Sequence, residues 1–72
     1  MTDIQFLTKI IKLNYTIRTF VRKGGTLKSL RGLDLLGRYD DMKREARHRC
    51  LWTLYCEEMK ITSDHNGYDL FA

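Results

Sequence analysis

The sequence has 72 residues, 43% of them hydrophobic and 31% charged, and a formal net charge of +4. This length excludes more than one domain, so residues 1–72 are expected to form a single small one, and the composition is typical of a globular chain rather than a disordered one. The charge is uneven: residues 1–33 carry seven basic residues and one acidic residue, whereas residues 34–72 carry six basic and eight acidic ones. A stretch of one sign attracts phosphates or acidic surfaces, although it can also serve solubility alone.

Neither a membrane span nor a secretory signal is expected. The apolar run over residues 4–21 is interrupted by charged side chains such as Lys9 and Lys12, and no basic segment followed by an apolar one opens the sequence. Cys50 and Cys56 would lie about 120° apart on a helix, in positions that cannot form a disulfide with each other. Two free thiols favour a reducing compartment, so we expect a cytoplasmic location.

A helix is predicted over about residues 3–22. Apolar residues recur there at intervals of three and four, and they cover an arc of roughly 220° at about 100° per residue. One partner helix covers only part of such an arc, so the excess predicts a homo-oligomer or a protein partner. Asn14 projects into the arc, where it would either set the register of an assembly or bond a neighbouring backbone group. The repeating apolar positions are Phe6, Ile10, Leu13, Ile17 and Phe20. The opposite face, which is polar and purely basic, carries Gln5, Lys9, Lys12, Thr16, Thr19 and Lys23.

Gly24 and Gly25 form the sharpest turn signal in the chain. Such a pair can end a helix through a left-handed residue, and Thr26 can then cap the next helix. Glycines before a helix can also expose backbone N–H groups to an anion, although the spacing of a Walker phosphate loop is missing. The basic residues that flank the turn and could hold a phosphate are Arg22, Lys23 and Lys28.

Two further helices are predicted, over about residues 27–36 and 38–60. Apolar residues step by three from Leu27 to Met42. A stripe with this spacing would wind around one continuous helix, because an α-helix has 3.6 residues per turn. Gly37 lies inside the drifting stripe and is therefore the expected corner between the two helices.

The longer of these helices combines a charged surface with an apolar stripe. Asp40 and Arg44 are four residues apart, as are Glu45 and Arg49, and both pairs are expected to form ion pairs. Trp52 falls off the stripe, so it is either a packing residue or an anchor for a partner. The stripe itself comprises Tyr39, Met42, Ala46, Cys50 and Leu54.

Residues 61–72 are expected to form a short irregular tail, which begins with turn-forming residues and ends in an aromatic patch. This patch would either fold back on the helices or dock on a partner. Catalysis is not expected, because His48 and Cys50 would project about 200° apart on a helix, which argues against a nucleophilic pair and a metal pair alike. Residues 29–49 could also form a helix-turn-helix, but Asp40 and Asp41 would then face phosphate oxygens.

The sequence therefore predicts an all-α protein, a small helical hairpin or three-helix arrangement that forms a homo-oligomer, in a style common among small proteins of phages and mobile elements. The leading hypothesis is a non-enzymatic binding protein for nucleic acid or a nucleotide, without a cofactor, metal or membrane. The alternative is a module that binds and modulates another protein. Residues expected to contact the anion are Lys9, Lys12, Arg22, Lys23, Thr26, Lys28, Arg31, Arg44 and Arg47. Residues expected to contact a protein partner are Trp52, Tyr68, Leu70 and Phe71.

Overall fold

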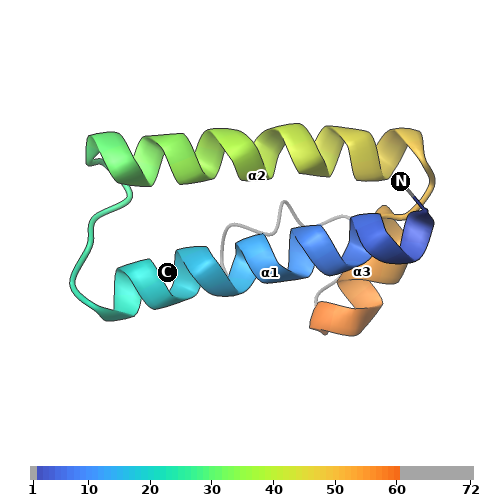
Figure 1. Ribbon diagram of the computed structural model, residues 1–72, viewed down its shortest axis with the longest axis horizontal. Coiled ribbons are helices and arrows are strands. Elements are labelled where there is room, and N and C mark those ends of the chain that lie inside the picture. Colours follow the sequence, from blue (N-terminus) through green and yellow to red (C-terminus); the bar gives the residue numbers. More distant parts are fainter. Residues whose placement is uncertain (1, 61–72) are drawn as a thin grey trace.

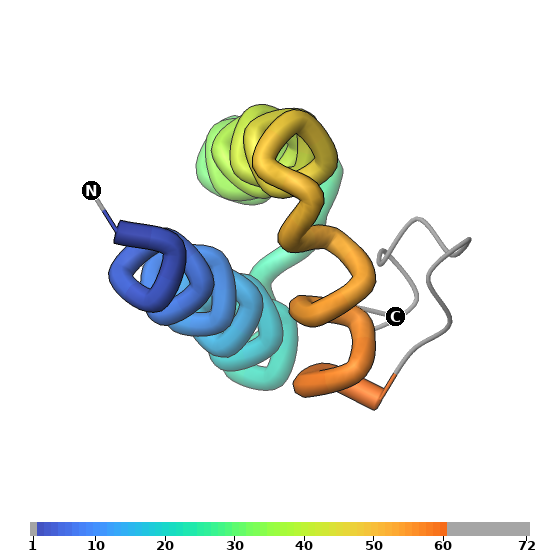
Figure 2. The backbone as a smooth tube through the Cα atoms, turned by 90° about the vertical axis from the view of Figure 1, so that its right-hand side faces the viewer, coloured from blue at the N-terminus to red at the C-terminus, as the bar shows by residue number. Residues whose placement is uncertain are grey.

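The computed structural model describes residues 2–60, which form three helices (Figure 1): α1 (Asp3–Arg22), α2 (Leu30–His48) and α3 (Trp52–Met59). The first two lie side by side and antiparallel, and the short third helix contacts both of them. In the view along the hairpin, α3 closes one of its sides (Figure 2). The predicted all-α class is confirmed.

Helix α1 begins and ends where the sequence predicted. Its N-cap is Thr2, which forms a capping box with Gln5: the Thr2 hydroxyl accepts from the Gln5 backbone N–H at 3.2 Å, and the Gln5 side chain accepts from the Thr2 N–H at 3.0 Å. At the other end Gly24 takes the left-handed conformation, with φ of 93°. The N–H groups of Gly24 and Gly25 donate back to the last turn of the helix, so the predicted glycine stop is confirmed.

The cap of α2 is Ser29 and not Thr26, so the predicted start at residue 27 was three residues early. The Ser29 hydroxyl accepts from the Gly32 N–H at 3.1 Å and donates to the Thr26 carbonyl at 2.7 Å. Gly32 is buried against this turn, and a Cβ there would overlap the Thr26 carbonyl and lie 2.6 Å from the Leu27 Cα. The absence of a side chain at Gly32 therefore lets the turn pack tightly on the first turn of α2.

The predicted corner at Gly37 was wrong, because α2 runs through it without a break. Leu30 and Leu33 produced the apparent three-residue drift, but they are 90% and 56% exposed and do not belong to the buried stripe. Gly37 lies on the exposed side of the helix, where a glycine weakens a helix by only about 1 kcal/mol and need not end it. The buried stripe of α2 is regular and comprises Gly32, Leu35, Tyr39 and Ala46.

The true corner falls at Cys50, inside the helix that was predicted over residues 38–60. Cys50 has φ of 60°, and the Leu51 N–H donates to the Ala46 carbonyl at 2.7 Å, the same reversal that Gly24 makes after α1. The expected burial of Cys50 in an apolar stripe was therefore wrong: it is exposed at the turn, whereas Cys56 is buried in α3. The two cysteines do not form a disulfide with each other.

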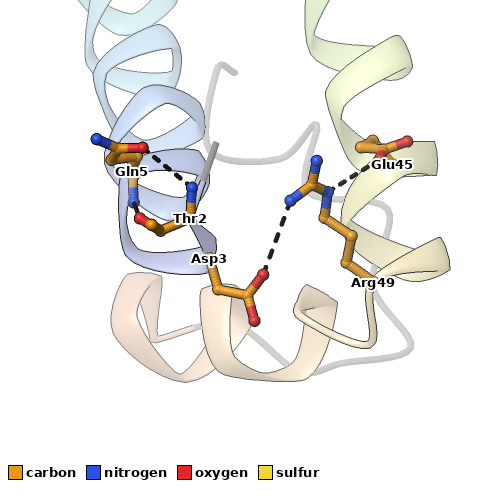
Figure 3. A network of polar contacts seen from close by, with 5 residues as sticks. All are labelled: Thr2, Asp3, Gln5, Glu45 and Arg49. Carbon is orange, nitrogen blue, oxygen red and sulfur yellow. Dashed lines mark hydrogen bonds and ion pairs between the residues drawn. The ribbon is translucent and has the colours of Figure 1, made fainter.

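Arg49 ties this corner to the start of α1 (Figure 3). Its Nε donates to Glu45 Oε1 at 2.9 Å, and its Nη1 lies 3.7 Å from Asp3 Oδ1. The guanidinium also lies over the Phe6 ring, 5.0 Å from its centroid. One half-buried arginine thus joins the start of α1 to the end of α2 through charge and through packing.

The core contains a polar cluster made of one side chain from each helix. Asn14 of α1 donates its amide hydrogen to the Tyr55 hydroxyl of α3 at 2.9 Å, and the hydroxyl groups of Tyr55 and Tyr39 are 3.0 Å apart. Asn14 therefore sets a register between helices of one chain, by a bond to a side chain rather than to a neighbouring backbone group. Because α1 contacts both α2 and α3, the width of its apolar arc no longer requires a second copy of the chain.

Candidate functional site

The basic face of α1 is an uninterrupted strip on the side of the helix turned away from the core. All of its side chains are exposed, and no acidic residue occurs between Asp3 and Asp34. Lys9 and Lys23, its outermost lysines, are 14 residues apart, which corresponds to about 21 Å along a helix that rises ~1.5 Å per residue. The basic face consists of Gln5, Lys9, Lys12, Thr16, Thr19 and Lys23.

A second group of bases surrounds the turn at the end of the antiparallel pair. Arg22, Lys28 and Arg31 are all exposed there, at the end opposite to the α2–α3 corner (Figure 1). Arg31 lies 3.5 Å from Asp34, whose carboxylate Arg38 also contacts at 3.2 Å, so the charge of Arg31 is shared with a neighbouring acid. Arg22 and Lys28 take part in no ion pair among residues 2–60. The turn therefore extends the positive charge of α1 beyond its last residue.

Arg44 and Arg47 lie apart from these two groups, in the C-terminal half of α2. Arg44 is bonded to Asp40 at 2.6 Å, which confirms the predicted pair, as the Glu45–Arg49 contact confirms the other. Arg47 lies over the Trp52 ring, 5.6 Å from its centroid. Arg44 is thus engaged within α2 and Arg47 packs on a ring of α3, so both side chains have partners outside the basic face.

Trp52 is buried, with only 5% of its surface exposed, at the start of α3. Its ring packs against Tyr55 with 5.1 Å between centroids, and Lys43 and Arg47 each lie 5.6 Å from the ring centre. This placement matches the packing interpretation, since an anchor for a partner would need an exposed ring. Tyr68, Leu70 and Phe71, the other expected protein contacts, lie outside the described residues.

Thr26 and the N-terminal half of α1 complete the candidate surface. Thr26 is exposed in the turn, where its carbonyl accepts from Ser29. Beside Lys9 and Lys12 lies a shallow, open hollow of about 410 Å³, which Ile4 also lines. Ile4 is 77% exposed, so the apolar arc does not close completely on the core.

Residues 2–60 contain no group of three or more His, Cys, Asp or Glu side chains arranged to hold a metal ion. None of the helices in this part of the chain combines the length and the apolar character needed to cross a membrane. Burial raises the pKa of the Tyr55 hydroxyl, against smaller opposing effects of its bonds to Tyr39 and Asn14. Because this hydroxyl belongs to the core cluster, its ionisation affects the stability of the fold.

Comparison of the chain with protein-family models, with curated proteins and with solved structures returned no match. The function must therefore be argued from the surface itself. Its distinctive property is the separation of charge: unpaired lysines follow one side of α1, whereas the described acids gather on α2 and α3 or at the N-terminus of α1.

Proposed function

We propose that the protein binds nucleic acid through the basic face of α1 and the bases around the Gly24–Gly25 turn. The observation that carries this proposal is that Lys9, Lys12 and Lys23 are exposed on one side of one helix and take part in no ion pair among the described residues. A row of like charges without counter-charges has a positive potential that attracts phosphates and releases their counterions on binding.

The length of the basic face favours a polymer over a single nucleotide. Lys9 and Lys23 are separated by about 21 Å along the helix, which corresponds to roughly six base steps at ~3.4 Å each. A helix exterior is convex, so these lysines can each approach a different phosphate, whereas they cannot converge on one.

A fluorescence-anisotropy titration with a short labelled oligonucleotide tests the proposal. We expect binding at low salt, with an affinity that falls linearly with salt concentration on logarithmic axes. Lys12→Glu should weaken binding by about tenfold, because it replaces a phosphate contact with a repulsion. Lys60→Glu is the matched control: it changes the net charge equally but lies at the end of α3, outside the basic face. Absence of binding at low salt, or equal loss in both variants, would contradict the proposal.

A protein partner is the second candidate, and exposed apolar side chains are the observation that favours it. Ile4 and Leu30 are the most exposed large apolar residues of the described chain. They lie on different helices, however, and Trp52, the expected anchor, is buried. Capture from a nuclease-treated lysate distinguishes the two candidates, because a partner held by these side chains would survive nuclease and moderate salt. Light scattering would show whether a homo-oligomer covers them instead.

A further inference from the structure

Tyr15 stands out from the other aromatic residues of the described chain. It is 54% exposed, whereas Phe6, Tyr39, Trp52 and Tyr55 are buried in the core. It borders the basic face, since three helical steps place it about 60° around the helix from Lys12. More than half of its surface is therefore available to a ligand, on the most basic helix of the protein.

The surroundings of Tyr15 are cationic on both sides along the helix. Lys12 precedes it by one turn, and the Arg18 guanidinium lies over its ring, 5.7 Å from the centroid. Arg22 follows two turns later, about 20° from the line of Tyr15 on the helix surface. Residues three and four apart are neighbours on a helix, so the ring lies within a row of phosphate-binding groups. The Arg18 guanidinium covers one face of the ring.

This arrangement has the two parts that proteins use to bind single strands. Positive charge follows the sugar–phosphate chain, and aromatic rings stack on unpaired bases, which a closed duplex does not offer. Two of the three neutral side chains of the basic face already bond within the helix: the Thr16 hydroxyl donates to the Lys12 carbonyl at 2.9 Å, and the Gln5 carbonyl oxygen caps the helix. Charge and stacking are therefore the main means of binding that this face offers.

We infer that Tyr15 is a base-stacking residue and that the ligand of the basic face is single-stranded nucleic acid. The inference rests on the proposed nucleic-acid function and names its substrate class. The base stacks on the ring while Lys12, Arg18 and Arg22 neutralise the phosphates on either side. Because the contacts are to bases and phosphates, the chemistry is shared by DNA and RNA.

Four labelled probes test the inference by anisotropy: a single-stranded DNA, its RNA counterpart, the DNA duplex and a DNA strand of equal length made of abasic sites. The wild-type protein should prefer the two intact single strands to the duplex and to the abasic strand. Tyr15→Leu should lose about tenfold or more in affinity for the intact strands, as expected for one lost stacking contact. Its binding to the abasic strand should equal that of the wild type.

Tyr15→Phe is the matched control, because it keeps the ring and removes only the hydroxyl group; it should bind intact strands like the wild type. Circular dichroism checks that both variants remain helical. Unchanged binding of intact strands by Tyr15→Leu, or duplex binding as tight as single-strand binding, would overturn the inference and leave the proposed function standing. Failure of every probe to bind at low salt would remove both.

Discussion

Asn14 and Tyr55 are joined in the core by a hydrogen bond of 2.9 Å, although they are 41 residues apart in the sequence. The bond connects α1 to α3, and the Tyr39 hydroxyl, 3.0 Å from that of Tyr55, adds α2 to the cluster. The Asn14 Oδ1 is buried without a hydrogen-bond partner among the described residues. Buried polar groups cost free energy when they lose their partners, so this cluster penalises any other placement of α3.

Tyr55→Phe should lower the free energy of unfolding by about 1–3 kcal/mol. The substitution keeps the ring packing but leaves the Asn14 amide without its acceptor, in a place that water does not reach. Urea unfolding followed by circular dichroism measures the change. Tyr15→Phe removes the same hydroxyl group from an exposed ring and should change stability by less than about 0.5 kcal/mol. Equal effects at the two positions would show that the core bond contributes no more than a surface group.

Stability should fall in alkaline solution through the same tyrosine. Burial raises the pKa of the Tyr55 hydroxyl above its ordinary value of 10.0. The unfolded chain loses this proton at the ordinary pKa, whereas the folded chain keeps it until the pH reaches the raised pKa. The free energy of unfolding therefore decreases as pH rises above 10.0 and is unaffected below it. The stability difference between the wild type and Tyr55→Phe should therefore shrink above this pH. Parallel pH profiles for the two proteins would contradict this expectation.

The same substitution should have opposite effects at two glycines of α2. Gly32→Ala places a Cβ against the backbone of Thr26 and Leu27, which cannot move aside as a flexible side chain would, and should destabilise by about 1–3 kcal/mol. Gly37→Ala meets nothing within 4 Å and should stabilise by roughly 0.5–1 kcal/mol, because alanine is the better helix former. Thermal melts of both variants measure these two changes in stability. A destabilising Gly37→Ala would indicate that α2 is interrupted there.

Cys50→Gly should stabilise the protein relative to Cys50→Ala by about 0.5–1 kcal/mol. Both variants remove the thiol, but only glycine adopts φ of 60° without a steric penalty. Chemical denaturation of the pair isolates the backbone contribution. If Cys50 instead continued a helix, as first predicted, the glycine variant would be the weaker of the two.

The outer surface of α1 could be predicted because a regular helix repeats every 3.6 residues, so the positions of Phe6 and Ile10 in the core also place Lys9 and Lys12 outside. The turn after α1 was equally clear, because a glycine occupies its left-handed position. The turn after α2 was not, since Cys50 fills the equivalent position and no residue type there indicates a positive φ. Gly37 led to the opposite error, because a glycine there predicted a turn where the helix continues.

The partner of Asn14 could not be predicted for a different reason. A helical pattern shows that the side chain faces inward, but which group meets it depends on the path of α3, and that path depends on the missed corner at Cys50. The same error concealed how α3 covers one flank of α1 and leaves Tyr15 at the border. The residues of the candidate surface, and the place of Tyr15 among them around the helix, were thus predictable from helix periodicity, whereas the exposure of Tyr15 and its contact with Arg18 required the fold.

Trp52 is the single tryptophan of the chain, and it lies on α3, buried against Tyr55 and beneath the cations of Lys43 and Arg47. The protein therefore carries a built-in spectroscopic reporter for one event, the docking of its shortest helix. Its emission should shift to the red when α3 detaches, even where circular dichroism changes little because α1 and α2 remain helical. Because the basic face contains no tryptophan, a ligand titration that leaves this emission unchanged would show that binding proceeds on a rigid scaffold.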